Sequence, residues 1–232
     1  MSEVQVLWRD ETAAVICKPS GMLAHNSSFA GPRERAALQS ARDALGAKVW
    51  LVQRLDRGTS GLMLVTLDGA HVQDWREAIA AGVKQYLAIA RGRLQTPAVV
   101  DAPLRDDRGV TRDAVSHVEP LAQSQVERVC LVRCTLETGR IHQARRHLNR
   151  LSHPVVNDAN HGDTRFNRAF RERWGSKRLM LHAHHLALQH PYTKEQICWQ
   201  APLSAEMASL IEELFGEETS ATLPSEPTTS TS

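Results

Sequence analysis

The pattern of apolar and polar positions predicts short strands and helices alternating along the first half of the chain. Aliphatic runs with β-branched residues predict strands at residues 4–10, 13–18, 49–52, 62–65 and 84–92. Apolar residues at helical spacing predict helices over residues 33–46 and 69–82. Each of these helices reaches a glycine, Gly46 or Gly82, which is a common helix terminator.

The second half of the chain is less regular. A run over residues 125–136 predicts a long strand, and residues 142–151 predict a helix that is entered through Gly139 and Arg140. The prolines and charged turns of residues 94–124 indicate short strands joined by exposed loops. Residues 217–232 are polar, contain proline and lack a hydrophobic period, so we expect this tail to be disordered.

Length and composition narrow the class of protein. A chain of 232 residues with 42% hydrophobic content can bury a core as one large domain or as two small lobes. No apolar run approaches the roughly 18 residues of a membrane span, and no signal peptide is recognisable, so a cytoplasmic protein without a membrane partner is expected. The four cysteines form no CxxC pair and are interpreted as reduced core residues.

The formal net charge of +2 hides an asymmetry along the chain. All 28 lysines and arginines precede residue 205 together with 20 of the 26 acids, so that part carries +8 and the remainder −6. Arginine outnumbers lysine by 23 to 5, and its planar donor fork suits phosphate. This balance favours a polyanionic partner such as nucleic acid. Arginine-rich, solvated helix faces are the alternative for any single residue.

The stretch QRLDRGTSG, residues 53–61, is predicted to be a loop between two strands. It places one carboxylate, Asp56, between Arg54 and Arg57, and a hydroxyl-rich turn follows. A surface turn whose aspartate bonds its own backbone would have the same composition. The loop alone therefore does not decide between a structural and a chemical role.

Four segments in order resemble the RluA family of pseudouridine synthases. The loop resembles the family's catalytic motif, KPSGMLAH at 18–25 resembles its KPxGxxxH segment, and KQY at 84–86 resembles its KxY segment. The fourth segment, at 136–147, resembles the family motif LxTGRxHQxRxH, with matches at Leu136, Thr138, Gly139, Arg140, His142, Gln143, Arg145 and His147.

This resemblance implies an α+β fold of the pseudouridine synthase type. Its mixed, mostly antiparallel sheet is expected to bend across a central cleft, with helices flanking it. One catalytic domain over residues 1–216 is expected, followed by the tail. Family members often carry an S4 RNA-binding domain in front, but the first predicted strand starts near residue 4, so none is expected here.

The resemblance also assigns roles to particular residues. Asp56 would be the catalytic carboxylate, by attack on the sugar or the base or by removal of a ribose proton, and these three roles stay open. Tyr86 would stack on the uracil, and Arg145 would pair with Asp56, since an arginine offsets the burial that would otherwise protonate the acid. The resemblance implies RNA contacts for Arg54, which would fill the gap left by a flipped base, and for Arg57, Arg140, His142 and Gln143. For His25 a local hydrogen bond is favoured.

The reaction implied by the resemblance is the conversion of uridine in RNA to pseudouridine, which needs no cofactor or metal. The segment from 153 to 190, with HGDTRFNR and RLMLHA, resembles a branch of the family acting on transfer RNA, near position 65, more than the branch acting on 23S ribosomal RNA. A monomer is expected. The chain departs from the family's usual residues at Gln53, where the family has His, and at Asn157, where it has Gly; Gly58 replaces the Pro of the branch that the chain resembles most.

Two other classes of function remain as alternatives. A noncatalytic RNA-binding module would keep the basic surface but would not need Asp56. A metal-dependent nuclease or hydrolase would need convergent ligands, yet the eleven histidines form no HExxH pattern, and only His182 and His184 of the 182–185 cluster share a strand face. No metal site is predicted.

Overall fold

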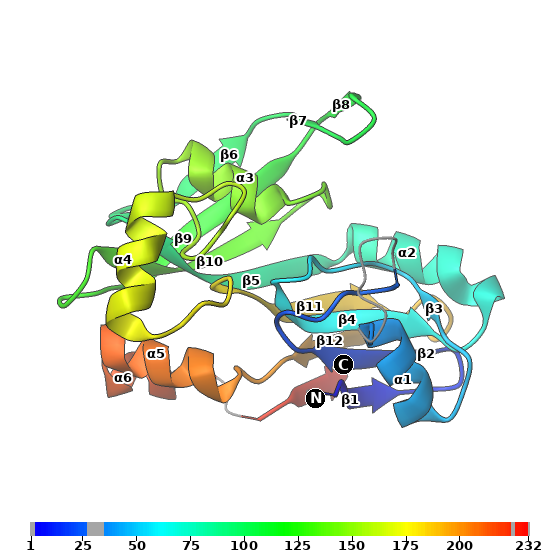
Figure 1. Cartoon of the computed structure of the whole chain (residues 1–232). Helices are drawn as coiled ribbons and strands as arrows, with labels where there is room; N and C mark the ends of the chain where they lie inside the picture. Colours follow the sequence, from blue (N-terminus) through cyan, green and yellow to red (C-terminus); the bar gives the residue numbers. More distant parts are fainter. Residues whose placement is uncertain (1–2, 27–34, 224–225, 232) are drawn as a thin grey trace. The chain divides into compact units, whose positions relative to one another are not determined.

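The computed structural model describes residues 3–26, 35–223 and 226–231, and these residues form two compact units (Figure 1). Unit 1 contains the described residues of Met1–Val83, Ala183–Pro202 and Pro224–Ser232, and unit 2 contains Lys84–His182 and Leu203–Leu223. Each unit is therefore assembled from separate stretches of the chain. The single catalytic domain predicted for residues 1–216 concerns the two units together and stays a prediction.

Unit 1 is built on a sheet in the order β1-β2-β4-β11. β12 extends it from β11, β13 pairs with β12, and the short β3 pairs with β4. The β1/β2, β2/β4, β3/β4, β11/β12 and β12/β13 pairs are antiparallel. The strands are β1 (Gln5–Arg9), β2 (Ala13–Lys18), β3 (Trp50–Leu51), β4 (Ser60–Thr66), β11 (Leu181–Gln189), β12 (Gln196–Gln200) and β13 (Thr228–Thr231).

The core of unit 1 lies where α2 (Val72–Ala81) packs on the sheet. Trp75 of α2 and Trp199 of β12 are both fully buried, and Trp8 of β1 makes edge contacts with the two rings. The Trp75 indole N–H donates to the hydroxyl of Thr12 at 3.1 Å, so its one polar group is satisfied. The unit also contains α1 (Ala37–Leu45) and the 3-10 turn η1 (Gly69–His71).

Unit 2 is built on an antiparallel sheet in the order β5-β10-β9-β6, with a separate β7/β8 hairpin. Four helices of its described residues accompany it. The strands are β5 (Val83–Arg91), β6 (Ala98–Asp101), β7 (Leu104–Arg105), β8 (Thr111–Arg112), β9 (Val115–Gln123) and β10 (Val129–Leu136). The helices are α3 (Gln143–Arg150), α4 (Thr164–Trp174), α5 (Ala205–Phe215) and α6 (Glu217–Ala221).

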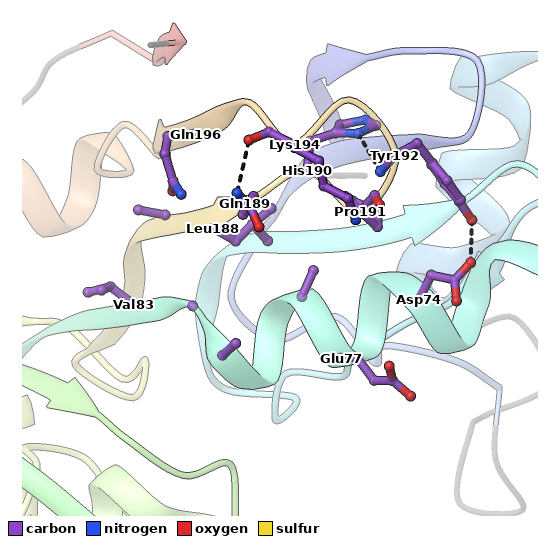
Figure 2. A pocket seen from close by; sticks show the side chains of 14 residues that line it. Asp74, Glu77, Val83, Leu188, Gln189, His190, Pro191, Tyr192, Lys194 and Gln196 are labelled. Atoms are coloured by element: carbon purple, nitrogen blue, oxygen red, sulfur yellow. Dashed lines mark hydrogen bonds between the residues drawn. The ribbon is translucent and has the colours of Figure 1, made fainter.

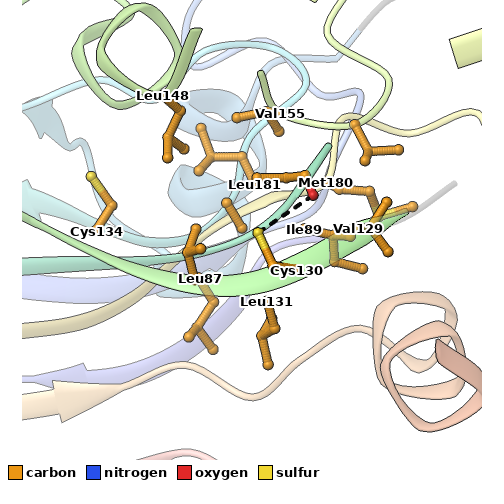
Figure 3. Close-up of a cluster of buried hydrophobic side chains, with 14 of the residues drawn as sticks. Leu87, Ile89, Val129, Cys130, Leu131, Cys134, Leu148, Val155, Met180 and Leu181 are labelled. Atoms are coloured by element: carbon orange, nitrogen blue, oxygen red, sulfur yellow. Dashed lines mark hydrogen bonds between the residues drawn. The ribbon is translucent and has the colours of Figure 1, made fainter. Parts of the chain in front are cut away.

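The core of unit 2 is aliphatic, as the low aromatic content requires. Figure 3 shows Leu87 and Ile89 of β5 with Leu131 of β10 among the buried side chains, and Leu148 of α3 joins the same cluster. β5 and β10 are buried over most of their length, so both read in the sequence as almost continuous apolar runs.

Most predicted elements are present, with shifted ends. The predicted helix 33–46 is α1, which begins at Ala37 and ends at Leu45, with Gly46 as its C-cap at φ +61°. Residues 33–34 of that prediction lie outside the described residues. The predicted helix 69–82 is η1 followed by α2. Residues 94–124 contain the expected short strands, but β9 is nine residues long because it pairs with both β10 and β6.

Two expectations are corrected by the structure. The tail was expected to be disordered, but the structure describes α6 and β13 within it. Polar Thr228–Thr231 forms a strand because its backbone pairs with β12, which a hydrophobic pattern does not reveal. The cysteines were all interpreted as core, whereas only Cys130 and Cys134 are buried, and Cys17 and Cys198 are half-buried.

Of the helices in the described ranges, none combines the length and the apolar character that a membrane crossing requires.

We expect Gly61→Ala to destabilise the protein by at least about 3 kcal/mol. Gly61 has φ +109°, and an added Cβ would lie 2.1 Å from the carbonyl oxygen of Ala183, so β4 would have to shift away from β11. The matched control is Gly46→Ala, which also has a positive φ but no atom within 4 Å of its Cβ, and which should cost about 1–2 kcal/mol. Urea unfolding measures both, and equal losses would contradict the steric argument.

Candidate active site

The predicted catalytic loop lies in unit 1 between β3 and β4. Its backbone turns tightly, because the carbonyl of Asp56 accepts a hydrogen bond from the N–H of Thr59 at 3.1 Å. The Asp56 side chain is half-buried, while Arg54 and Arg57 are exposed. The structure thus gives one partly shielded carboxylate on a constrained turn, flanked by two solvent-facing arginines.

The KPSG segment at 18–21 holds this turn in place. The ammonium of Lys18 is fully buried and donates to the carbonyl oxygens of Pro19 (2.9 Å), Met22 (2.7 Å) and Arg57 (3.2 Å). An ammonium can only donate, and these carbonyl oxygens are acceptors for its N–H groups. The loop following β2 is thereby tied to the loop that carries Asp56.

Backbone contacts reinforce the same attachment. The N–H of Gly21 donates to the carbonyl of Arg57 at 2.8 Å, and the hydroxyl of Ser20 donates to the carbonyl of Gly58 at 2.7 Å. The Arg57 Nε in turn donates to the carbonyl of Gly21 at 3.0 Å. The sequence pattern indicated this segment only as the end of a strand, and the role of Lys18 was missed. The signal was a lysine continuing the otherwise apolar strand AAVICK, whose neighbours are buried on both faces.

His25, for which a local hydrogen bond was expected, is half-buried. Its Nδ1 is buried and has no hydrogen-bond partner among the residues that the structure describes. The expectation is therefore not supported at that nitrogen, and residues 27–34 beside it lie outside the described ranges.

The remaining predicted site residues belong to unit 2. Tyr86 lies on β5 opposite Cys134 of β10 and is half-buried against the core of that unit. Lys84 lies two residues earlier on the same face of β5, where burial lowers the pKa of its ammonium. The expected pairing of Arg145 with Asp56 would join the two units, and it stays a prediction.

Gln143 organises the entrance of α3. Its Oε1 accepts hydrogen bonds from the Thr138 hydroxyl (2.7 Å) and the Arg140 N–H (2.9 Å). Its Nε2 donates to the Val115 carbonyl (2.9 Å) and the Ser116 hydroxyl (3.0 Å). The side chain is only 2% exposed. These contacts support a positioning role for Gln143, and the RNA contact predicted from the sequence stays a prediction.

His147, the last residue of the motif, fixes the same helix one turn further on. It is fully buried, with Nδ1 2.8 Å from the Ser116 hydroxyl and Nε2 3.1 Å from the Ala102 carbonyl. The carbonyl can only accept, so Nε2 carries the proton and Nδ1 accepts from the serine. Burial lowers the pKa of His147, which keeps the ring neutral at physiological pH.

Two half-buried arginines near the start of α3, Arg140 and Arg146, are anchored to the β7/β8 hairpin region. Arg140 Nε donates to the carbonyl of Asp113 at 2.8 Å, and Arg146 Nη1 donates to the carbonyl of Arg105 at 2.9 Å. A cavity of about 230 Å³ lies here, lined by both arginines and by Arg112. The predicted RNA contact by Arg140 has a suitable setting in this cavity.

His142 has an unusual backbone at the start of α3. Its φ is +52°, in the left-handed region that non-glycine residues rarely adopt. Its Nδ1 lies 3.0 Å from Nε2 of His161, so at least one of the two rings must be neutral. Burial lowers the pKa of His161, consistent with that requirement.

Arg145 forms a buried ion pair that was not predicted from the sequence. Its Nε lies 2.7 Å from Asp158 Oδ2, and its Nη2 lies 2.8 Å from Oδ1. Oδ1 of Asp158 also accepts the N–H groups of Asn160 and His161, both at 2.9 Å. Burial opposes ionisation of this carboxyl, but the hydrogen bonds outweigh it and the pKa of Asp158 is lowered. Asp158 therefore fixes one side of the Arg145 guanidinium.

The substitution of Asn157 for the family's usual glycine has a structural reason. Asn157 has φ +64°, a conformation that asparagine tolerates better than most residues. Its Nδ2 donates to the Ser176 carbonyl at 3.0 Å, and its Oδ1 accepts from Arg171 Nε at 3.0 Å. The side chain thus adds contacts that glycine lacks while keeping the same backbone.

Unit 1 contains a different cavity, of about 630 Å³, between α2 and the turn after β11 (Figure 2). Asp74 and Glu77 line it, and the Tyr192 hydroxyl donates to Asp74 at 2.7 Å. Partial burial and this carboxylate raise the pKa of Tyr192 to about 12. With Lys194 also in the lining, the cavity has one more acidic than basic charge and none of the predicted site residues, so it is not part of the candidate site.

Within the described ranges, no group of three or more His, Cys, Asp or Glu side chains is placed to hold a metal ion.

Residues 12–150 match the family described as RNA pseudouridylate synthase, which includes the Asp56 loop, Tyr86 and the α3 motif. The chain is 33% identical to the tRNA pseudouridine synthase C of Vibrio cholerae, covering 93% of this chain and 97% of that protein. It is 34% identical to the protein of the same name from Yersinia pestis, covering 88% and 90%. The resemblance to the transfer-RNA branch of the family is thereby confirmed.

Two solved structures share the fold. Human RNA Pseudouridylate Synthase Domain Containing 4 superposes with a TM-score of 0.72 over 90% of this chain and 92% of that one, at 23% identity. Human RNA Pseudouridylate Synthase Domain Containing 1 gives 0.65 over 80% and 78%, also at 23% identity. The predicted α+β fold of this type is confirmed.

We expect Lys18→Met to lower the free energy of unfolding by about 3 kcal/mol, because three carbonyl oxygens lose their buried donor. The turn that carries Asp56 should also lose its attachment. Urea unfolding measures the first effect and limited proteolysis near residue 57 measures the second. Lys177→Met, at an exposed lysine, is the control and should change neither. A Lys18→Met protein as stable as the control would contradict the attachment.

We expect Arg145→Met to cost about 3–5 kcal/mol, because it leaves the Asp158 carboxylate buried without its cation. Adding Asp158→Asn should recover part of that loss, since the asparagine Oδ1 still accepts from the two backbone N–H groups.

The pH dependence tests the same pair. The pKa of Asp158 is lowered from 3.8, so its stabilisation is present above about pH 4 and is lost as the pH falls through the folded-state pKa. Thermal unfolding between pH 7 and 3 would show a smaller acid loss in the double variant than in the natural protein. Identical profiles would contradict the role of the pair.

Proposed function

Because this chain belongs to the RNA pseudouridylate synthase family, we propose that it converts a specific uridine of a transfer RNA to pseudouridine. The observation that carries the substrate proposal is the 33% identity to a tRNA pseudouridine synthase C along nearly the whole length of both proteins. The enzyme is an isomerase, and its product has the same atoms as its substrate.

The reaction exchanges one glycosidic bond for another. The bond between ribose C1′ and uracil N1 breaks, the base turns, and a bond forms between C1′ and C5. The proton leaves C5 and N1 carries one in the product, so no oxidant, reductant or water is consumed. What the protein must supply is an ionised group at the sugar, a surface for the freed base, and a route for one proton.

Asp56 is the group proposed to act at the nucleoside. Its half-buried position on a turn held by Lys18 supports this role, because a carboxylate must be held in place to act on a single bond. Attack on the sugar, attack on the base and removal of a ribose proton all use the same ionised carboxylate. Arg145 is proposed to orient Asp56 with the part of its guanidinium that Asp158 leaves available.

Tyr86 is proposed to stack on the uracil. A half-buried ring at the margin of a core is well supported from behind and can offer a face to a base. Since a base inside a helix is out of reach, the target nucleotide must be flipped out, and exposed Arg54 is proposed to fill the space it leaves. Arg57, Arg140 and His142 are proposed to contact the surrounding RNA.

We further infer that the enzyme works in the cytoplasm and as a monomer. Sedimentation of the purified protein with and without RNA tests the monomer.

The RNA and the position are tested by chemical mapping of pseudouridine in total RNA from a deletion strain. Loss of one pseudouridine near position 65 of transfer RNAs would support the proposal. If the deletion strain instead lost a pseudouridine from 23S ribosomal RNA, with transfer RNA unchanged, the proposed substrate would be contradicted. The proposed reaction would still hold.

We expect Asp56→Asn to abolish turnover, by a factor of at least about 10³, while the dissociation constant for RNA changes by less than about threefold. The substitution removes the ionised oxygen but keeps the shape of the side chain and the basic surface. Tritium release from C5-labelled RNA measures turnover, and filter binding measures affinity.

Asp68→Asn is the matched control in the same unit. Asp68 accepts the Ala70 N–H at 2.9 Å, and asparagine can replace it there, so activity should be unchanged. Measurable pseudouridine formation by the Asp56→Asn protein would remove Asp56 from the mechanism.

A further inference from the structure

Unit 2 contains a second basic cavity at the N-terminus of α4. Its volume is about 650 Å³, and the end of β5, the residue before β10 and the first turn of α4 all contribute to it. Four arginines, Arg91, Arg93, Arg128 and Arg165, line it together with one acid, Asp163. With histidine neutral, these side chains give the cavity a formal charge of +3.

The floor of the cavity is fixed by the backbone. The N–H of Arg91 donates to the Pro154 carbonyl at 2.9 Å, and the N–H of Gly92 donates to the Arg128 carbonyl at 2.8 Å. The ring of His153 donates from Nδ1 to the Arg91 carbonyl at 2.9 Å. Gly92 has φ +99°, and an added Cβ would lie 2.5 Å from that ring nitrogen, so the close approach requires glycine.

The four arginines fall into two kinds. Arg91 forms an ion pair with Asp163, whose Oδ1 also caps α4 by accepting the Phe166 N–H at 2.9 Å. Arg93, Arg128 and Arg165 are exposed, and their guanidinium groups have no ion-pair or hydrogen-bond partner within the described part of the chain. Three guanidinium groups thus line one cavity, and its one acid, Asp163, is already paired with Arg91.

We propose that this cavity binds backbone phosphates of the RNA substrate, as a contact site separate in sequence from the catalytic motifs; the proposal rests on the RNA-modifying function above. Guanidinium groups match the oxygen pairs of a phosphate, and three of them line this cavity without an ion-pair partner in the described residues. The three unpaired arginines come from three different segments, which suits a chain of phosphates rather than one enclosed ion.

The test is a pair of variants on the exposed arginines. Arg93→Ala with Arg165→Ala should weaken binding of unmodified transfer RNA by at least about tenfold at moderate salt. The slope of log Kd against log salt should fall by about 2, because each removed arginine leaves one phosphate with its counterion. The rate at saturating RNA should be unchanged while KM rises, because the reacting groups are untouched.

Two further variants separate a specific site from general charge. Arg168→Ala lies on the same helix, is exposed and does not line the cavity, so it should change Kd by less than about twofold. Arg93→Lys with Arg165→Lys keeps the charge and should restore most of the salt slope. Equal weakening by Arg168→Ala, or a wild-type Kd and slope in the double alanine variant, would overturn the proposal.

Titrations with small anions test whether the cavity binds RNA phosphates or a free anion. Titration with inorganic phosphate and with uridine monophosphate should give only millimolar binding. Micromolar binding of either, lost in the double alanine variant while RNA affinity stays the same, would assign the cavity to a free anion and overturn the proposal. The proposed function is tested separately with the unsubstituted protein. It fails if that protein makes no pseudouridine in transfer or ribosomal RNA.

Discussion

The buried ammonium of Lys18 is the contact on which the candidate catalytic loop depends. It brings together carbonyl oxygens from the loop after β2 and from the turn that carries Asp56. Three carbonyl oxygens from the two loops accept from this one buried group, so the contacts persist only while the loops stay in register. The same contact that satisfies the lysine therefore restricts the backbone beside Asp56. A catalytic carboxylate gains from this restriction, because small errors in its position cost much of the rate.

In unit 2 a network of buried hydrogen bonds, rather than one ammonium, holds the candidate site residues in place. Gln143 and His147 tie α3 to β9 through Ser116, which both residues contact. Asp158 then holds Arg145 with two parallel hydrogen bonds. A network of this kind stabilises only when each buried polar group has its partner, and here the glutamine uses all four of its hydrogen-bonding positions. The orientation of α3 is thereby decided by polar contacts as well as by the apolar packing of Leu148.

Hydrophobic patterning located the buried strands and α2, because apolar spacing is a local property of the sequence. It also marked Gly46 as a helix end, where the left-handed backbone favours glycine. The motifs of the candidate site were recognisable as a set, but the partners of their residues were not. Asp158 lies thirteen residues after Arg145, and Thr228 pairs with Gln200, so both contacts arise only when separate segments meet. The tail was misjudged for this reason, since β13 has no apolar face and is ordered by its hydrogen bonds to β12.

The two basic cavities of unit 2 differ in how their arginines are held, and this difference supports different contributions to the proposed RNA binding. At the entrance of α3, Arg140 and Arg146 donate to backbone carbonyls, so their guanidinium groups are fixed in direction and can recognise one local arrangement of RNA. At the N-terminus of α4, Arg93, Arg128 and Arg165 are not held by ion pairs within the described residues, so they can follow phosphates whose spacing varies. Fixed donors favour discrimination because a wrong partner leaves them unpaired, whereas exposed cations contribute affinity that depends on salt and little on sequence. A protein that must find one uridine in a large polyanion needs both.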